Sequence, residues 1–188
     1  MSENNVKSYY KEFYKTQVVT NLKQTNNFKN IMSIPKVEKI TLNMGVGIRD
    51  SKILEMALKD MEEIAAQKPV VTKSRKSIAN FKLREGMKLG VKVTLRGDNM
   101  YNFLQRLIFV AMPQIQDFMG LSEKSFDGRG NYSLGIKDIL AFGIEFKNND
   151  SYHTGLDISI TTSAVNDEGA LLLLRELGFP FKQKRNKI

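Results

Sequence analysis

Five short segments of this chain alternate apolar and polar residues, and this pattern limits the possible folds more than any other feature. The segments are residues 37–46, 78–84, 91–96, 140–146 and 156–160. Successive side chains of a β-strand point to opposite faces, so each segment is expected to be a strand with one apolar and one polar face. A doubly wound parallel sheet would need strands that are apolar on both faces. The pattern therefore predicts a largely antiparallel, five-stranded sheet, in which the second and third segments form a hairpin.

The stretches between these segments have the periodicity of amphipathic helices. Apolar residues recur at helical spacing within residues 7–24, 54–65, 100–111 and 170–177. Asp98 is a suitable N-cap for the third of these helices. Since every predicted strand has one polar face, we expect the helices to pack on a single side of the sheet. The prediction is an α+β fold whose other sheet face is open to a partner.

The chain is expected to form one domain over residues 1–188. It would comprise an N-terminal helical segment at 1–30 and a basic tail at 182–188. No apolar run reaches the ~18 residues that a membrane span needs, and the first residues lack the apolar core of a signal peptide. We therefore predict a cytoplasmic protein that does not contact a membrane.

The net charge of +9 is distributed very unevenly. Residues 68–96 contain nine basic residues and one acidic residue, whereas residues 97–181 contain six basic and eleven acidic residues. Segregated positive charge creates a local field that attracts a polyanion, which favours a nucleic-acid partner. The alternative interpretation is a hydrated basic loop without a partner.

Enzymatic and metal-binding motifs are incomplete or missing in the sequence. The chain has no cysteine and a single histidine, His153, so thiolate zinc sites and cysteine nucleophiles are excluded. The glycines of 45–47 do not complete a dinucleotide fingerprint, and 127–131 lacks the Lys-Ser/Thr of a phosphate-binding loop. We predict no catalytic residue, no metal and no cofactor. An enzyme acting on RNA and a free DNA-binding regulator remain as alternatives.

The polar faces of three predicted strands would form a surface suited to RNA. Lysine and arginine neutralise phosphates, while asparagine and threonine hydrogen-bond to sugars and base edges. The polar residues predicted to share this open face are Lys39, Thr41, Asn43, Asn80, Lys82, Arg84, Lys92, Thr94 and Arg96. A second basic segment, residues 67–77, leads into the predicted hairpin.

Several motifs, in order along the chain, carry a resemblance to a known family. They are Val37–Gly47, Gln67–Pro69, Thr72–Ala79, Lys92–Gly97, Lys124–Tyr132, Gly155–Ile158 and Phe179–Phe181. Together they resemble large-subunit ribosomal protein five, the 5S rRNA-binding protein, in its bacterial form. The resemblance extends from about Tyr9 to Lys182. One departure is Phe142-Gly143-Ile144-Glu145, where family members often have Phe-Pro-Glu-Ile.

The resemblance implies that the protein attaches 5S rRNA to the large subunit in the central protuberance, beside large-subunit rRNA and other proteins of that region. By motif position it assigns rRNA contacts to Asn43, Gln67, Thr94 and Arg96. Lys39, Thr41 and Lys92 join them because they share the predicted open face.

The resemblance also implies two contacts outside the large subunit's own RNA. The family's basic loop reaches P-site transfer RNA, and the matching residues here are Lys73, Ser74, Arg75, Lys76, Ser77, Lys82 and Arg84. A bridge to small-subunit ribosomal protein thirteen is implied too, without assigned residues.

Overall fold

The computed structural model describes residues 9–25, 30–48, 51–116, 118–143 and 154–182. Its strands are β1 (Val37–Gly45), β2 (Val70–Lys73), β3 (Lys88–Leu95), β4 (Tyr132–Ile136) and β5 (Leu156–Thr162). Its α-helices are α1 (Tyr9–Phe13), α2 (Val19–Thr25), α3 (Ser51–Ala65), α4 (Gly97–Arg106), α5 (Met112–Gln114) and α6 (Asp167–Glu176). Short π-helical turns at Tyr14–Val18 and Leu107–Ala111 join α1 to α2 and α4 to α5.

The five strands form one antiparallel sheet in the order β2-β3-β1-β5-β4. Its central strand, β1, alternates as predicted: Ile40, Leu42 and Met44 are fully buried, while Thr41 and Asn43 are partly exposed. The expected α+β fold with an open antiparallel sheet is confirmed. The succession of element types along the chain also agrees with the prediction, although two of the five strands are formed by other segments than those predicted.

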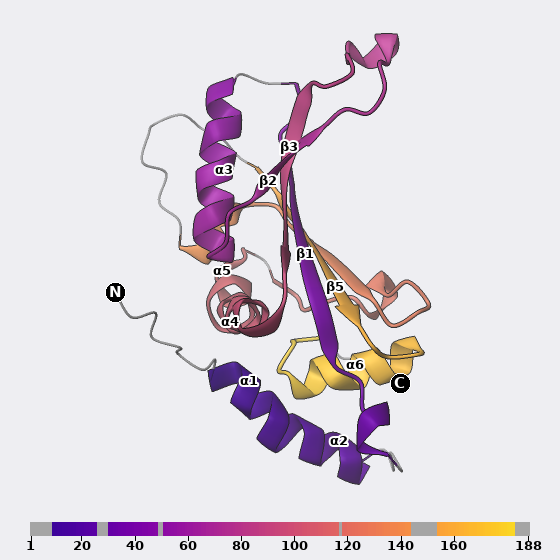
Figure 1. Ribbon diagram of the computed structural model, residues 1–188. Coiled ribbons are helices and arrows are strands. Elements are labelled where there is room, and N and C mark those ends of the chain that lie inside the picture. Colours follow the sequence, from indigo (N-terminus) through magenta and orange to yellow (C-terminus); the bar gives the residue numbers. More distant parts are fainter. Residues whose placement is uncertain (1–8, 26–29, 49–50, 117, 144–153, 183–188) are drawn as a thin grey trace, which may run out of the picture.

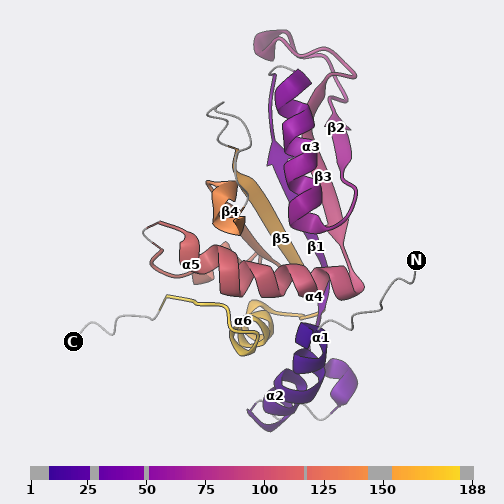
Figure 2. The ribbon, with the colours of Figure 1, turned by 90° about the vertical axis from the view of Figure 1, so that its left-hand side faces the viewer.

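Helices α3 and α4 cover the apolar face of the sheet, as Figures 1 and 2 show from two directions. Met61 of α3 and Leu104 of α4 are fully buried and belong to the same hydrophobic cluster as the apolar row of β1. Helices α1, α2 and α6 lie at the lower end of the molecule in Figure 1. There the Tyr10 hydroxyl donates a hydrogen bond to the Leu177 carbonyl, which joins the two ends of the described chain.

The strand predicted at residues 78–84 does not exist. The partner of β3 at this edge is β2, and Ala79–Phe81 is a short 3₁₀ turn inside the connection between them. Ala79 and Phe81, which would lie on the apolar side of this strand, are exposed, and neither they nor Leu83 belong to the hydrophobic core. Lys82 has a positive φ of 53°, which a strand does not allow. Asn80, Lys82 and Arg84 are therefore in a loop and not on the sheet face.

The strand predicted at residues 140–146 is also wrong. The fourth strand is β4, and Ile139–Phe142 is a 3₁₀ helix. Phe142 is buried while Leu140 is exposed, although the prediction placed both on one apolar face. Ile144 and Phe146 lie outside the described residues. Residues 132–136, which form β4, also alternate, with Tyr132, Leu134 and Ile136 on one side. This segment becomes a strand because its backbone pairs with β5.

Gly90 of β3 occupies a position where a side chain would not fit. It is buried opposite Gly45 of β1, and an added Cβ would lie 2.5 Å from the Met44 carbonyl oxygen. Because that oxygen belongs to the central strand, it has little freedom to move. We expect Gly90→Ala to lower the free energy of unfolding by about 1–3 kcal/mol, measured by urea denaturation. Gly135→Ala in β4 is the control, since its Cβ would meet nothing closer than Asp157 Oδ1 at 3.7 Å. Equal midpoints for the two variants would contradict this prediction.

Candidate nucleic-acid interface

The open face of the sheet carries rows of polar side chains that cross from strand to strand. Residues directly opposite each other in an antiparallel pair point to the same face. The register therefore aligns Lys92 of β3, Asn43 of β1 and Asp157 of β5 in one row, and Thr94, Thr41 and Ser159 in the next. Lys39 lies opposite Thr161, and the hydroxyls of Ser133 and Ser159 are 3.3 Å apart. The polar face is thus continuous from β3 to β4.

Asn43 lies at the centre of this face, between a cation and a carboxylate. Its Nδ2 donates a hydrogen bond to Asp157 Oδ2 at 3.3 Å, and Lys92 lies opposite it on the other side. The bond orients the amide and leaves Asn43 Oδ1 and one N–H for another partner. Asp157 was not among the site residues predicted from the sequence. The alternation of Leu156, Asp157 and Ile158 was the signal that could have located it.

Gln67 and Arg96 lie at the ends of the strands and not within them. Gln67 precedes β2, and its Nε2 donates a hydrogen bond to the Thr94 carbonyl at 3.4 Å. Arg96 directly follows β3 and is exposed. The structure therefore places Lys39, Thr41, Asn43, Lys92 and Thr94 on the open face, with Gln67 beside Thr94 and Arg96 at the end of its strand.

Residues 74–87, which we call the basic loop, connect β2 to β3 and project beyond the sheet in Figure 1. Backbone hydrogen bonds close the loop at its base, from Ser74 N to the Met87 carbonyl (2.8 Å) and from Gly86 N to the Ser74 carbonyl (3.0 Å). Farther out, Ile78 and Leu83 exchange two backbone hydrogen bonds of 3.0 and 3.1 Å. The loop is a hydrogen-bonded projection with a defined course.

The residues expected to contact transfer RNA lie in or next to this loop. Lys73 ends β2, and the side chains of Lys73, Arg75, Lys76, Lys82 and Arg84 are all exposed. Two serines of the set have roles inside the loop. The Ser77 hydroxyl accepts a hydrogen bond from the Glu85 N–H at 3.0 Å, and the Ser74 hydroxyl donates one to the Lys76 carbonyl at 2.7 Å. These hydroxyls support the shape of the loop.

The positive charge of residues 68–96 is not neutralised by ion pairs with the acidic residues that the structure describes. All nine basic side chains of this stretch are exposed, and none of them forms an ion pair with another described residue. Ion pairs occur elsewhere, between Lys11 and Asp98 and between Arg175 and Glu123. The open face and the basic loop therefore keep a positive field that attracts phosphates.

Comparison with known proteins decides the family. The family model described as ribosomal protein L5 matches residues 30–84, and the model for the C-terminus of the same ribosomal family matches residues 88–181. Proteins named large ribosomal subunit protein uL5 from Francisella philomiragia and Francisella tularensis subsp. novicida are 57% identical over 175 residues, which cover 92% of this chain and 97% of each relative. The chain belongs to the ribosomal protein L5 family.

Membership of the L5 family makes this chain a ribosomal structural protein and not an enzyme. The two L5 family models adjoin at the end of the basic loop, between residues 84 and 88. Strands β1 and β2 belong to the first match, and β3, β4 and β5 belong to the second. Both parts are needed for the sheet, because β1 pairs with β3 and β5.

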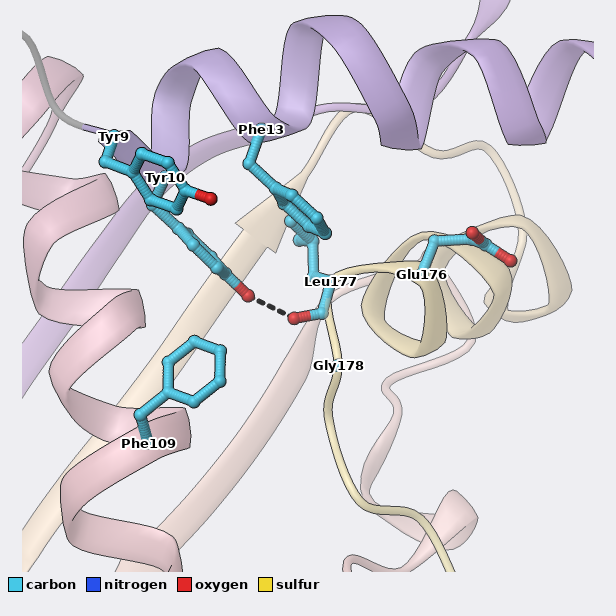
Figure 3. Close-up of a pocket in the computed structure, with 7 residues that line it drawn as sticks. All are labelled: Tyr9, Tyr10, Phe13, Phe109, Glu176, Leu177 and Gly178. Atoms are coloured by element: carbon cyan, nitrogen blue, oxygen red, sulfur yellow. Dashed lines mark hydrogen bonds between the residues drawn. The ribbon is translucent and has the colours of Figure 1, made fainter.

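This L5-family chain also has a small aromatic pocket of about 190 Å³ away from the open face, drawn in Figure 3. It lies between α1, the π-helical turn after α4 and the end of α6. The Tyr10 ring stacks on Phe13 with 5.5 Å between centroids and meets Phe109 edge-on at 6.2 Å. Burial raises the pKa of Tyr10, so its hydroxyl stays protonated and keeps donating to Leu177. The pocket is a packing feature at the junction of three helical segments.

Metal-binding clusters and membrane-spanning helices are both absent from the described part of the chain. Its residues contain no group of three or more His, Cys, Asp or Glu side chains that could hold a metal ion. None of its helices is both long enough and apolar enough to span a membrane. His153, the one histidine, lies outside this part of the chain.

Proposed function

We propose that this protein is a structural component of the large ribosomal subunit that binds 5S rRNA on the open face of its sheet. Its relatives are named as large-subunit proteins, which supports assembly of this chain into the large subunit. The main support for an RNA-binding surface is the row of Lys92, Asn43 and Asp157, which crosses three strands of the open face. The opposite face of the sheet is covered by α3 and α4 and is not available to a partner.

Binding would depend on complementary shape and charge between the open face and the RNA, and it would involve no chemical step. The cations Lys39, Lys92 and Arg96 would neutralise phosphates. The neutral groups of Thr41, Asn43, Gln67 and Thr94 would hydrogen-bond to riboses and bases. Held in this way, 5S rRNA would be attached in the central protuberance, next to large-subunit rRNA and neighbouring ribosomal proteins.

Two further contacts belong to the same proposal. The basic loop and Lys73 at its base would contact the backbone of P-site transfer RNA, using Lys73 and the exposed loop cations Arg75, Lys76, Lys82 and Arg84. Its projection beyond the sheet supports a partner other than the RNA on the open face. The family resemblance also supports a bridge to small-subunit ribosomal protein thirteen, but it does not assign this contact to particular residues of the chain.

A competition experiment tests the proposed RNA preference. The purified chain would be titrated with labelled 5S rRNA at a fixed salt concentration, with unlabelled 5S rRNA or duplex DNA as competitor. Since the phosphate contribution depends steeply on salt, the comparison is valid only at one ionic strength. We expect 5S rRNA to compete much more strongly than duplex DNA of equal phosphate content. A preference for DNA would overturn the proposal in favour of a DNA-binding regulator.

A further inference from the structure

The outer part of the basic loop exposes a large aromatic side chain. Phe81 is 66% exposed, and it belongs neither to the hydrophobic core nor to the residues that pack against it. Its neighbour Ile78 is 43% exposed. Scattered apolar residues on a surface need no explanation. Here, however, Phe81 belongs to the short 3₁₀ turn at the outer end of a projecting, hydrogen-bonded loop.

Backbone hydrogen bonds define the course of the main chain at Phe81. The Phe81 N–H donates to the Ile78 carbonyl at 3.2 Å, and the Lys82 N–H donates to the Ala79 carbonyl at 3.0 Å. Lys82 adopts the left-handed conformation, with φ 53° and ψ 29°, which is uncommon for a residue with a side chain. Strained backbone of this kind persists where the surrounding structure enforces it, often at a binding site. The turn therefore fixes the backbone from which the exposed Phe81 side chain extends.

The charges around the ring indicate what it would contact. Lys73, Arg75, Lys76, Lys82 and Arg84 surround Phe81 in the sequence of this projection, against one acidic residue, Glu85. If the partner of Phe81 were an apolar pocket on another protein, the excess of cations around Phe81 would have no partner in that pocket. A nucleic acid offers both partners at once, phosphates for the cations and a base plane for the ring.

We infer that Phe81 stacks on an unpaired nucleobase of the transfer RNA that the basic loop contacts. This inference rests on the proposed transfer RNA contact and adds a second kind of interaction to it. The cations would give a salt-dependent attraction to the backbone, whereas Phe81 would give a contact to a base that salt barely screens. Stacking on one base contributes about 1–3 kcal/mol, which corresponds to a factor of about 5 to 150 in affinity.

The deciding experiment uses ribosomes whose only copy of this chain carries Phe81→Ala, Phe81→Leu or Phe81→Trp. The dissociation rate of P-site transfer RNA would be measured at several salt concentrations. We expect the Ala and Leu variants to release transfer RNA at least about fivefold faster at every salt concentration, since both lack a ring face. The Trp variant should behave like the unmodified chain. The dependence on salt should stay unchanged in all three, because no phosphate contact is lost.

A second measurement reports stacking directly. The chain contains no tryptophan, so Phe81→Trp introduces a single fluorescent reporter. In the purified variant we expect transfer RNA to quench this fluorescence, and an RNA duplex without unpaired bases to quench it less. Full fluorescence in a chain bound to transfer RNA would overturn the inference.

The outcomes separate this inference from the function on which it rests. Unchanged release from the Phe81→Ala ribosomes, with faster release after reversal of Arg75 and Lys76, would overturn base stacking and leave the transfer RNA contact in place. Unchanged release in both cases would remove the contact itself. Normal behaviour of Phe81→Leu would show that an apolar side chain suffices, and would favour a protein pocket as the partner.

Discussion

Ribosomes whose chain carries both Arg75→Glu and Lys76→Glu are expected to bind P-site transfer RNA at least about tenfold more weakly at low salt. Both side chains are exposed in the basic loop, and neither forms an ion pair with a described residue. The double change replaces two attractions to phosphate with two repulsions. The slope of log affinity against log salt should become shallower by about 1.4 to 1.8, since each lost phosphate contact removes about 0.7 to 0.9. Filter binding of transfer RNA at several salt concentrations measures both quantities.

A matched control separates the position of these charges from the total charge of the protein. Lys52→Glu with Lys59→Glu makes the same change in net charge on exposed positions of α3, which covers the opposite side of the sheet. This control should leave transfer RNA affinity nearly unchanged. The melting temperature of the purified Arg75/Lys76 variant should also stay close to that of the unmodified chain, because the loop contributes nothing to the core. A parallel loss of thermal stability and affinity would show that the loop acts through the fold.

Replacing Asn43 with alanine is expected to weaken 5S rRNA binding by a factor of about 5 to 150, which corresponds to the 1–3 kcal/mol cost of an unsatisfied hydrogen-bonding group. The small change in volume would not explain such a loss. Two causes act together. The variant removes an amide from the centre of the open face, and it leaves the Asp157 carboxylate without its Asn43 donor beside the bound RNA. A titration with labelled 5S rRNA at one fixed salt concentration measures the effect.

Ser133→Ala provides the comparison for Asn43→Ala. Ser133 is an exposed polar residue of the same face, but it lies on β4 at the edge of the sheet, two strands from Asn43. Its hydroxyl is 3.3 Å from Ser159 Oγ and far in the sheet order from the cations of β3. We expect this variant to bind 5S rRNA almost as well as the unmodified chain. Unchanged binding by Asn43→Ala would exclude Asn43 from the site.

Local sequence patterns predicted those elements whose apolar residues all reach the core. The alternation of residues 37–46 located β1 because Ile40, Leu42, Met44 and Val46 all reach the hydrophobic core. The periodicity of residues 54–65 located α3 for the same reason. Where an alternation is short, it no longer distinguishes a strand from a loop. Ile78 and Phe81 belong to such a loop, and the four residues of β2 were too few and too mixed to mark a strand.

The composition of the candidate site was predictable from the sequence, but its arrangement was not. Charge segregation pointed to residues 68–96, and the polar sides of β1 and β3 supplied Lys39, Thr41, Asn43, Lys92 and Thr94. The bond from Asn43 to Asp157 joins residues 114 positions apart, and the one from Gln67 to Thr94 joins residues 27 apart. Only strand pairing brings these groups together, so a local pattern could not reveal them.

By itself, the sequence determined the α+β class, the positions of the main helices and of β1, β3 and β5, and the stretch that holds the positive charge. These properties follow from periodicity and composition, which act over neighbouring residues. The tertiary structure decided which alternating segments became strands, which polar groups meet on the open face, and where Phe81 lies. A strand is stable only when its backbone groups find a partner strand and its apolar side finds a helix to pack against. Those partners come from distant parts of the chain, and only the folded molecule brings them together.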